Sequence, residues 1–418
     1  MTASSQNPPP QGALAGVRVL DLGRVLAAPW ATQILGDMGA EVIKIERPGG
    51  GDMGRLYGPG FLIDAEGRRT QESSFYLCAN RNKKSVTVDL ASADGQQIIK
   101  DLASQCDVLV ENFVAGTMER LGLDYPAIRA INPGIIYCSV TGYGQDGPYA
   151  DRPGFDAVFQ AHAGMMSVTG IPDGLPGAGP MKTGPSLIDV MTGYNAAVGI
   201  MAALLHRERS GEGQHIDVAL LDTAVACQSH LMSNYLVSGQ LPERRGTEGN
   251  GGGPAQVFKC RDGEIYISAG NDHNFVDLCG VLGAPELGRD PRFVTVQDRY
   301  VHRAELVPLM AGLVERWERF RLMDALVEAK VACSVVNSYA DVEDDPQVRH
   351  REVFIDMPHP LSPTGVVRGV ANPVRLSRTP VRYERHPPLL GEHNDEVLRD
   401  LLEFDADTLA DYRARRVI

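Results

Sequence analysis

The chain has 418 residues, of which 43% are hydrophobic and 22% are charged, a composition typical of a folded globular protein. This length is enough to bury a large core and favours two domains. The 53 acidic residues outnumber the 40 basic ones, so the formal net charge is −13. That charge disfavours nucleic acid or an anionic membrane as the main partner, and any anionic ligand must be met by local positive groups.

The cysteines and the N-terminal residues indicate a compartment. The chain has 7 cysteines and no CxxC pair, which predicts a reduced, cytoplasmic protein without a zinc site or other metal. Residues 1–15 are polar and proline-rich, so we expect a disordered lead-in and not a signal peptide. No run approaches 18 uninterrupted apolar residues, and we therefore expect no transmembrane span.

The first half of the chain alternates short apolar strands with helices. Residues 17–22 and 41–46 have the pattern of strands and flank a helix at 28–39, which predicts a parallel βαβ unit. The same alternation predicts further strands at 85–90, 108–111 and 135–140, with helices near 93–105 and 126–131. We expect an α/β fold in which a Rossmann-like open parallel sheet forms the large domain.

Beyond residue 222 the pattern changes to that of a smaller α+β domain. We expect large-domain residues at 16–222, a small domain at 223–329, and a return segment at 330–418 that completes the large domain. The elements expected in these later parts are a helix at 223–238, strands at 256–260 and 264–268, helices up to about 329, strands at 334–336 and 373–376, and a helix at 394–402.

Two glycine-containing loops lack the motifs of nucleotide-binding enzymes. The loop after the first strand, GRVLAAP at 23–29, has no GxGxxG pattern, which disfavours a nicotinamide or flavin dinucleotide site. The glycine-rich stretch at 246–254 has no following Lys-Ser/Thr and is not a P-loop. On composition alone it is a linker. The basic run at 80–85 is, on composition alone, a solvated turn.

Asp189 lies between a Gly- and Pro-containing loop and an apolar helix expected at 190–209, which Gly211 ends. An aspartate at this position can cap the helix, a contribution worth about 0.5–2 kcal/mol. It can also be a functional carboxylate, and spacing alone leaves both readings open.

The segment at 184–222, GPSLIDVMTGYNAAVGIMAALLHRERSGEGQHIDVALLD, resembles a signature of the family III CoA-transferases, which include the formyl-CoA:oxalate and carnitine CoA-transferases. The blocks KIERPGGGD at 44–52 and ENFVAGTMERLG at 111–122 resemble the same family. The resemblance implies an interlocked, ring-like homodimer that acts on an acyl-CoA thioester and a small carboxylic acid, with no permanently bound cofactor and no nucleic acid or membrane partner. It also implies that Asp189 is the nucleophile.

The resemblance assigns the remaining site residues as well. It implies that the glycine loop at Gly251, Gly252 and Gly253 covers the active aspartate, and that the chain after the basic run approaches the adenine of CoA. CoA-binding roles fall on Val25, Leu26, Ala27, Arg47, Val88, Asn112, Phe113, Arg120, Leu121 and Arg152.

The resemblance further implies a reaction and a substrate class. The blocks at 141–148, 233–236 and 270–275 look most like members that use succinyl-CoA and short dicarboxylic acids. We therefore expect CoA to pass from an acyl-CoA to a free carboxylic or dicarboxylic acid through a covalent anhydride and aspartyl-CoA intermediate on Asp189. Leu26 replaces a polar residue of formyl-CoA transferase, which argues against oxalate or formate.

Two other functions fit the same residues. The related α-methylacyl-CoA racemases pair their aspartate with a histidine, and this chain has Phe155 at that place. The missing histidine disfavours racemisation, and His162, seven residues further on, is interpreted as structural. The alternatives are a racemase-type isomerase, which would exchange the α-proton with solvent, and a non-catalytic acyl-CoA binding protein, which would bind CoA without transfer.

Overall fold

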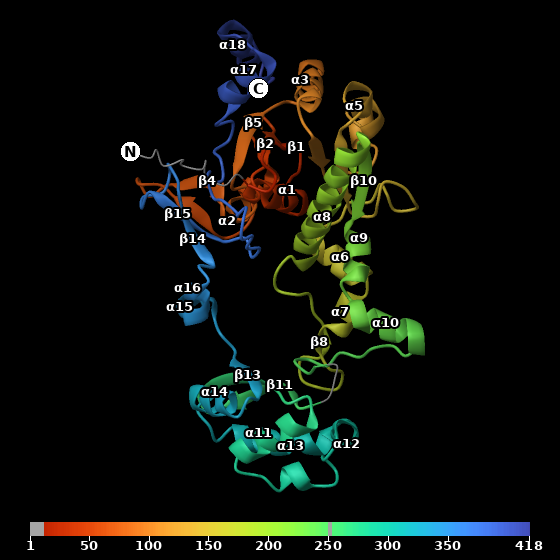
Figure 1. The fold of residues 1–418 in the computed structure, drawn as a ribbon, viewed down its shortest axis with the longest axis vertical. Coiled ribbons are helices and arrows are strands. Elements are labelled where there is room, and N and C mark those ends of the chain that lie inside the picture. The colour runs from red at the N-terminus through yellow and green to blue at the C-terminus, as the bar shows by residue number, and fades with distance from the viewer. Residues whose placement is uncertain (1–11, 250–252) are drawn as a thin grey trace, which may run out of the picture. The chain divides into compact units, whose positions relative to one another are not determined.

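The computed structural model describes residues 12–249 and 253–418, which form two compact units, each with its own core (Figure 1). The first unit consists of the chain up to Met165, Lys182–Leu241 and Arg351–Ile418. The second consists of Met166–Met181 and Pro242–His350. The sequence placed the small domain at 223–329, whereas in the structure the chain returns to the first unit at Arg351.

A six-stranded sheet forms the centre of the first unit, and each pair of neighbouring strands is parallel. The strand order is β10-β7-β6-β1-β2-β5, so the first strand lies inside the sheet and the chain winds outward to both edges. This confirms the predicted open parallel sheet. The strands are β1 (Arg18–Asp21), β2 (Glu41–Glu46), β5 (Lys83–Thr87), β6 (Val108–Glu111), β7 (Ile136–Thr141) and β10 (Gln214–Ala219).

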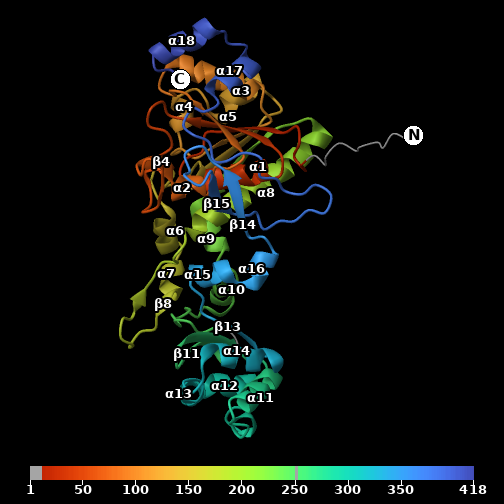
Figure 2. The same ribbon diagram turned by 90° about the vertical axis from the view of Figure 1, so that its left-hand side faces the viewer.

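Helices cover both faces of this sheet, because its strands carry apolar side chains on both sides. Val19 and Val42 pack on one face against α1 (Ala27–Asp37) and α8 (Leu187–Ser210). The alternate strand residues Leu20 and Ile43 pack on the other face. Figure 2 shows that face covered by α3 (Ala93–Ser104), α5 (Tyr125–Ile131), α17 (Asn394–Leu402) and α18 (Ala406–Ala414).

Helix α8 packs closely on α1. A Cβ atom at Gly193 would lie 2.7 Å from the carbonyl oxygen of Ala27, so only glycine allows this approach. Of the helices in the described part of the chain, α8 alone is long and apolar enough to cross a membrane by length and composition. Core helices pass the same test, and the packing on α1 and on the sheet accounts for the apolar character of α8.

The return segment covers one edge of the sheet. The His393 amide donates to the Ser85 carbonyl at 2.9 Å, and Asn394 Oδ1 accepts from the Thr87 amide at 2.8 Å. Strand β5 is at the edge of the sheet, so these backbone groups would be unpaired if the edge were exposed.

Several other elements were not predicted, and two predictions were wrong. Residues 373–376 are not a strand, and the helix expected at 223–238 is divided into α9 (Leu220–Ala226) and α10 (Ser229–Ser238). The division falls at Cys227 and Gln228, and Ser229, with which α10 begins, has a left-handed φ of 47° that interrupts a continuous helix. The first unit also contains η1 (Met53–Leu56), β3 (Phe61–Ile63), β4 (Arg69–Ser73), α2 (Ser74–Leu77), α4 (Thr117–Arg120), α6 (Asp156–His162), β14 (Phe354–Pro358) and β15 (Val366–Val370), and α7 (Met165–Val168) follows α6.

The second unit is built on a small antiparallel sheet of strand order β11-β12-β13. Phe258, Ile265 and Ile267 of this sheet pack against its helices in a separate core. Its elements are β8 (Gly170–Ile171), β9 (Gly179–Pro180), β11 (Ala255–Cys260), β12 (Gly263–Ser268), α11 (Asp272–Val281), η2 (Leu287–Arg289), α12 (Val296–Val301), α13 (Arg303–Val314), α14 (Arg319–Glu328), β13 (Ala332–Val335), α15 (Tyr339–Asp344) and α16 (Pro346–His350).

Two buried ion pairs involve strands of the large sheet. Lys44 Nζ lies 2.9 Å from Asp52 Oδ2, and Lys83 Nζ lies 2.9 Å from Asp21 Oδ2, with all four side chains shielded from solvent. Burial lowers the pKa of Lys83 to about 8 although Asp21 opposes the shift. The basic run at 80–85 is therefore not a solvated turn, and Arg81 in the same run is buried as well.

A third buried cluster joins η1 and β4 to the return segment. Arg55 contacts Glu46 at 2.8 Å and Glu72 at 2.7 Å, and its Nη2 donates to the Pro388 carbonyl at 2.9 Å. Tyr76 Oη donates to the same carbonyl at 3.1 Å. Because these charges are out of water, removal of one partner leaves another unpaired in the interior.

We expect Glu46→Ala to destabilise the protein by about 3–5 kcal/mol, because it leaves Arg55 buried with only one carboxylate partner. Urea denaturation followed by circular dichroism measures the loss. The control is Glu66→Ala, which removes an exposed ion pair with Arg68 and should change the free energy of unfolding by less than about 1 kcal/mol. Equal losses in the two variants would contradict the prediction.

Candidate active site

The loop after β1 has an unusual backbone that two side chains hold in place. Val25 has φ of 68°, which is rare for a β-branched residue. Its amide donates to Asp52 Oδ1 at 2.9 Å. The side chain of Asn112 forms two hydrogen bonds with the backbone of Arg24, the residue before Val25. Its Oδ1 accepts from the Arg24 amide at 2.9 Å, and its Nδ2 donates to the Arg24 carbonyl at 2.8 Å. Asn112, which the sequence assigned to CoA, therefore positions this loop.

A cavity of about 220 Å³ opens between this loop and the start of α8. It lies beyond the carboxyl ends of β1, β6 and β7, where open parallel sheets bind their ligands. Its lining brings together, from separate parts of the sequence, the candidate residues Val25, Leu26, Ala27, Asn112, Phe113, Arg152 and Asp189.

Other candidate residues lie outside this cavity. Arg47 is exposed after β2, the side chain of Val88 is buried in the core, and Arg120 is exposed on α4, where it contacts Thr117 Oγ1 at 3.1 Å. Their assignment to CoA stays a prediction. Leu121 packs at the edge of the second core, Gly253 belongs to the second unit, and Gly251 and Gly252 lie outside the described residues.

Asp189 lies within the first turn of α8, because the helix begins at Leu187 and not at residue 190 as predicted. The cap comes from Asp156 of α6, whose Oδ2 accepts from the amides of Ile188 at 2.7 Å and Asp189 at 3.1 Å. Within residues 12–249 and 253–418, no donor bonds the Asp189 carboxylate. The capping role that spacing allowed for Asp189 is thus performed by another aspartate.

The environment of Asp189 disfavours its charge. Burial, reinforced by the neighbouring Asp156 carboxylate, raises the pKa of Asp189 to about 7. A carboxylate that lacks hydrogen bonds and lies near a second acid is poorly stabilised as an anion, and its lone pairs are free to attack. Such a perturbed group in a cavity is a candidate nucleophile.

The cavity contains no histidine among its described lining residues. Phe155 lines it and is 60% exposed. His162 lies elsewhere, with its Nδ1 3.3 Å from Tyr143 Oη and its ring beside Tyr149. Among the described residues, the pairing of an aspartate with a histidine that the racemases use is therefore not assembled around Asp189.

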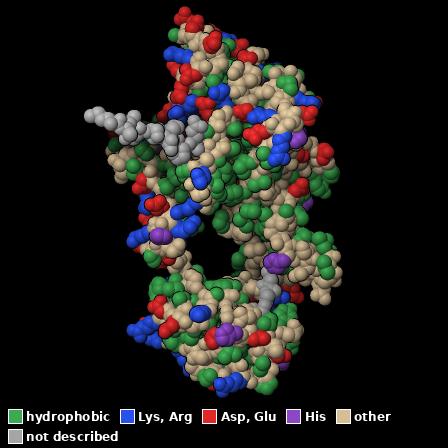
Figure 3. All heavy atoms as spheres, viewed as in Figure 1, with side chains coloured by type: hydrophobic (Ala, Val, Ile, Leu, Met, Phe, Trp, Pro, Cys, Tyr) green, Lys and Arg blue, Asp and Glu red, His purple; other side chains and the backbone are tan. Residues whose placement is uncertain are grey.

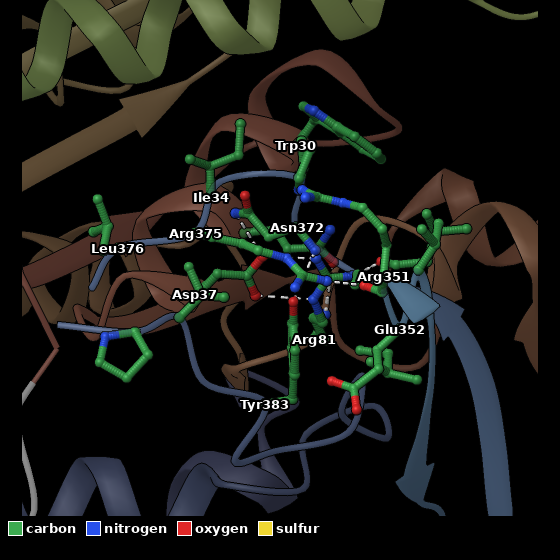
Figure 4. A pocket seen from close by; sticks show the side chains of 18 of the residues that line it. Trp30, Ile34, Asp37, Arg81, Arg351, Glu352, Asn372, Arg375, Leu376 and Tyr383 are labelled. Carbon is green, nitrogen blue, oxygen red and sulfur yellow. Dashed lines mark hydrogen bonds and ion pairs between the residues drawn. The ribbon is translucent and has the colours of Figure 1, made fainter. Parts of the chain in front are cut away.

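A larger cavity of about 720 Å³ lies elsewhere in the first unit (Figure 4). Its walls include Trp30 and Ile34 of α1, and Arg81 and Asp37 form an ion pair of 2.6 Å beside them. Trp30 Nε1 is buried and has no hydrogen-bond partner among the described residues. This cavity is mainly apolar and is lined neither by Asp189 nor by the loop after β1, so it is not the candidate active site.

Sequence reasoning missed three polar residues at or near the site. Arg24 lines the cavity and lies in the GRVLAAP block, and Asp156 follows Phe155 directly. Glu111 ends β6, where burial raises its pKa to about 7. Arg24 and Glu111 occur inside motifs that the sequence analysis quoted, but a charged residue in a motif does not reveal which partner it faces.

Comparison with known proteins adds to this geometry. The profile of CoA-transferase family III matches residues 14–394. The chain belongs to CoA-transferase family III. Succinate–glutarate CoA-transferase of Agrobacterium fabrum is 41% identical over 96% of this chain and 98% of the relative, and succinyl-CoA:glutarate CoA-transferase of Homo sapiens is 40% identical over 97% and 90%. A solved CAIB/BAIF family protein from Brucella suis has a TM-score of 0.83 and 38% identity, covering 94% of this chain and 100% of that one.

Membership confirms the predicted activity class, and this protein is a CoA-transferase. The sequence-based recognition of the family is likewise confirmed, as is the mixed α/β fold. The CoA-transferase also shares the fold of a second solved relative, Rv3272 from Mycobacterium tuberculosis, with a TM-score of 0.80 and 32% identity over 93% of this chain and 99% of that one.

We expect Asp189→Asn to stabilise the protein at pH 8 by on the order of 2 kcal/mol. The substitution removes a carboxylate whose ionised form is less stable in the folded protein than in the unfolded chain. Below pH 7 the wild type takes up the proton, so the gain shrinks, and it vanishes below the usual aspartate pKa of 3.8. Urea denaturation at pH 8, 6 and 4 measures this.

The control is Glu208→Gln on the exposed part of the same helix, where water solvates the charge. We expect its effect to stay within about 0.5 kcal/mol at each pH. A gain for Asp189→Asn that is the same at pH 8 and pH 4 would show that the carboxylate is not destabilised by its surroundings.

Proposed function

We propose that this CoA-transferase moves CoA from succinyl-CoA, or a similar acyl-CoA, to a free short dicarboxylic acid, with Asp189 as a covalent nucleophile. The observation that carries the proposal is the Asp189 carboxylate itself, which lines a cavity, has no hydrogen-bond donor among the described residues and has a pKa raised to about 7. The dicarboxylic acids named for the relatives from Agrobacterium fabrum and Homo sapiens support the substrate class.

The chemistry suits a carboxylate, because it preserves the activation of the acyl group. Asp189 attacks the thioester carbonyl, the C–S bond breaks, and CoA leaves as a thiolate, which gives a mixed anhydride. The thiolate then attacks the Asp189 carbonyl carbon, the donor acid leaves as its carboxylate, and an aspartyl-CoA thioester remains. The acceptor carboxylate repeats both steps in reverse, so no net proton or electron is exchanged.

The loop at 23–27 and Phe113 offer surfaces for the CoA chain beside Asp189. Val25, Leu26 and Ala27 line the cavity together with Phe113. Arg47 and Arg120 are exposed after strands β2 and β6, where guanidinium groups can meet phosphates. Water has to be excluded from this site, since it would hydrolyse the anhydride.

We also propose that the enzyme is a homodimer of the interlocked type. Helix α8 exposes Val198 at 60% and Leu205 at 50%, seven residues apart and so on one face of the helix. Hydrophobic side chains gather over the part of the first unit where α1 and α8 lie (Figure 3). Such apolar surface on a folded chain favours contact with another protein, and a second copy is the occupant proposed here.

The covalent step is tested by mass spectrometry of the intact protein and its peptides after mixing with succinyl-CoA and then hydroxylamine. We expect a hydroxylamine-sensitive CoA adduct on the Asp189 peptide, and none in Asp189→Ala. The matched control is Asp222→Ala, an exposed aspartate that does not line the cavity, which should keep the adduct. Adduct formation by Asp189→Ala, or none by the wild type with a panel of acyl-CoAs, would overturn the proposal.

The dimer is tested by light scattering coupled to gel filtration. We expect the wild type to have twice the 45.2 kDa mass of one chain, and Val198→Glu/Leu205→Glu to shift material toward one chain, because it buries charge in an apolar contact. Glu208→Ala, on an already polar part of the helix, should leave the mass unchanged. A wild type that elutes as a single chain would contradict the proposal.

A further inference from the structure

The backbone of Arg24 is held in place by hydrogen bonds, whereas its guanidinium has no ion-pair partner among the described residues. Asn112 holds the backbone of Arg24 from both sides, at 2.9 Å and 2.8 Å, so the side chain starts from a defined point. Its guanidinium lies over the ring of Phe113, with Cζ 4.0 Å from the ring centroid. Within residues 12–249 and 253–418, Arg24 forms no ion pair within 4 Å. It therefore retains its hydrogen-bond donors for a ligand.

The charge of Arg24 is partly desolvated, and the nearby acids are engaged elsewhere. Burial lowers the pKa of Arg24, while Asp52 and Glu111 oppose the shift from a distance. Asp52 is paired with Lys44 at 2.9 Å, and Glu111 Oε2 accepts from the Phe113 amide at 2.8 Å. A guanidinium withdrawn from water without a close partner is costly unless an anion joins it.

Arg24 and Arg152 are the cations among the described residues that line the cavity of Asp189. Arg152 is exposed, and its guanidinium lies over Tyr149 with Cζ 3.8 Å from the ring centroid. An exposed cation is screened by solvent and discriminates weakly between ligands. The less exposed Arg24 is the better candidate for selecting a substrate by its charge.

We propose that Arg24 binds the second carboxylate of the dicarboxylic substrate, the one that does not react. This inference rests on the proposed function, in which Asp189 attacks one end of a dicarboxylic acyl group. The planar fork of an arginine matches a carboxylate with two parallel hydrogen bonds. The donor and the acceptor each carry such a spectator carboxylate, and they occupy the site in turn, so one arginine serves both half-reactions.

The test compares two donors that differ only at the far end of the acyl group. Succinyl-CoA ends in a carboxylate, and butyryl-CoA ends in a methyl group of similar size. Rapid quench and mass spectrometry of the CoA adduct measure the single-turnover rate of the first half-reaction for each donor. We expect Arg24→Gln to slow the reaction with succinyl-CoA on the order of 100-fold and the reaction with butyryl-CoA less than about 3-fold. Arg24→Lys should recover part of the succinyl-CoA rate.

Because the two donors share their CoA moiety, the comparison distinguishes binding of the far carboxylate from binding of a CoA phosphate or shaping of the loop. If Arg24 held a CoA phosphate or only shaped the loop, Arg24→Gln would slow both donors equally, and this inference would be wrong. It would also be wrong if neither donor were slowed. Arg152→Gln is the matched control, and we expect it to leave the ratio of the two rates unchanged. A wild type that forms no adduct with either donor would instead overturn the transfer chemistry, and this inference with it.

Discussion

Asp52 connects the buried charges of the sheet to the loop that forms the cavity. One of its oxygens lies 2.9 Å from Lys44 Nζ, and the other accepts from the amides of Val25 at 2.9 Å and Gly54 at 2.8 Å. Lys44 in turn donates to the Gly23 carbonyl at 2.8 Å. The left-handed backbone of Val25 is costly by itself, and this ion pair holds it in place. Backbone strain persists here because buried charges on neighbouring elements fix both sides of the loop.

Asp52 and Asp189 show how one residue type performs two tasks in the same unit. Burial would raise the pKa of both, but Lys44 and the amide donors reverse that effect at Asp52, whose pKa is lowered. Asp189 has no such donors among residues 12–249 and 253–418, and the carboxylate of Asp156 adds to the effect of burial. Asp52 is therefore a stable anion suited to structure, whereas Asp189 carries a charge that its surroundings leave uncompensated. The charge of Lys44 and the hydrogen-bond donors, more than depth of burial, separate the two.

The parts of the fold that depend on local patterns were predictable from the sequence. Strands 41–46 and 108–111 and helix 394–402 match the structure, since apolar runs and helical periodicity encode them directly. What depends on distant partners was not predictable. The helix begins before Asp189 because Asp156, far away in the sequence, provides its cap. The basic run at 80–85 is buried because Asp21 and Asp37 come from other elements to meet it.

The same limit applies to the candidate site, where motifs identify residues but not what they contact. The motif at 111–122 singled out Asn112 as a ligand of CoA, yet both ends of its amide are used by the backbone of Arg24. A substitution at Asn112 would therefore act on the site through the position of Arg24 and of the strained residue that follows it. Loss of CoA affinity in such a variant would not show that Asn112 touches CoA. Hydrogen bonds to the backbone set the geometry of the loop at 23–27. The side chain of Arg24 takes no part in them and is therefore available to a substrate.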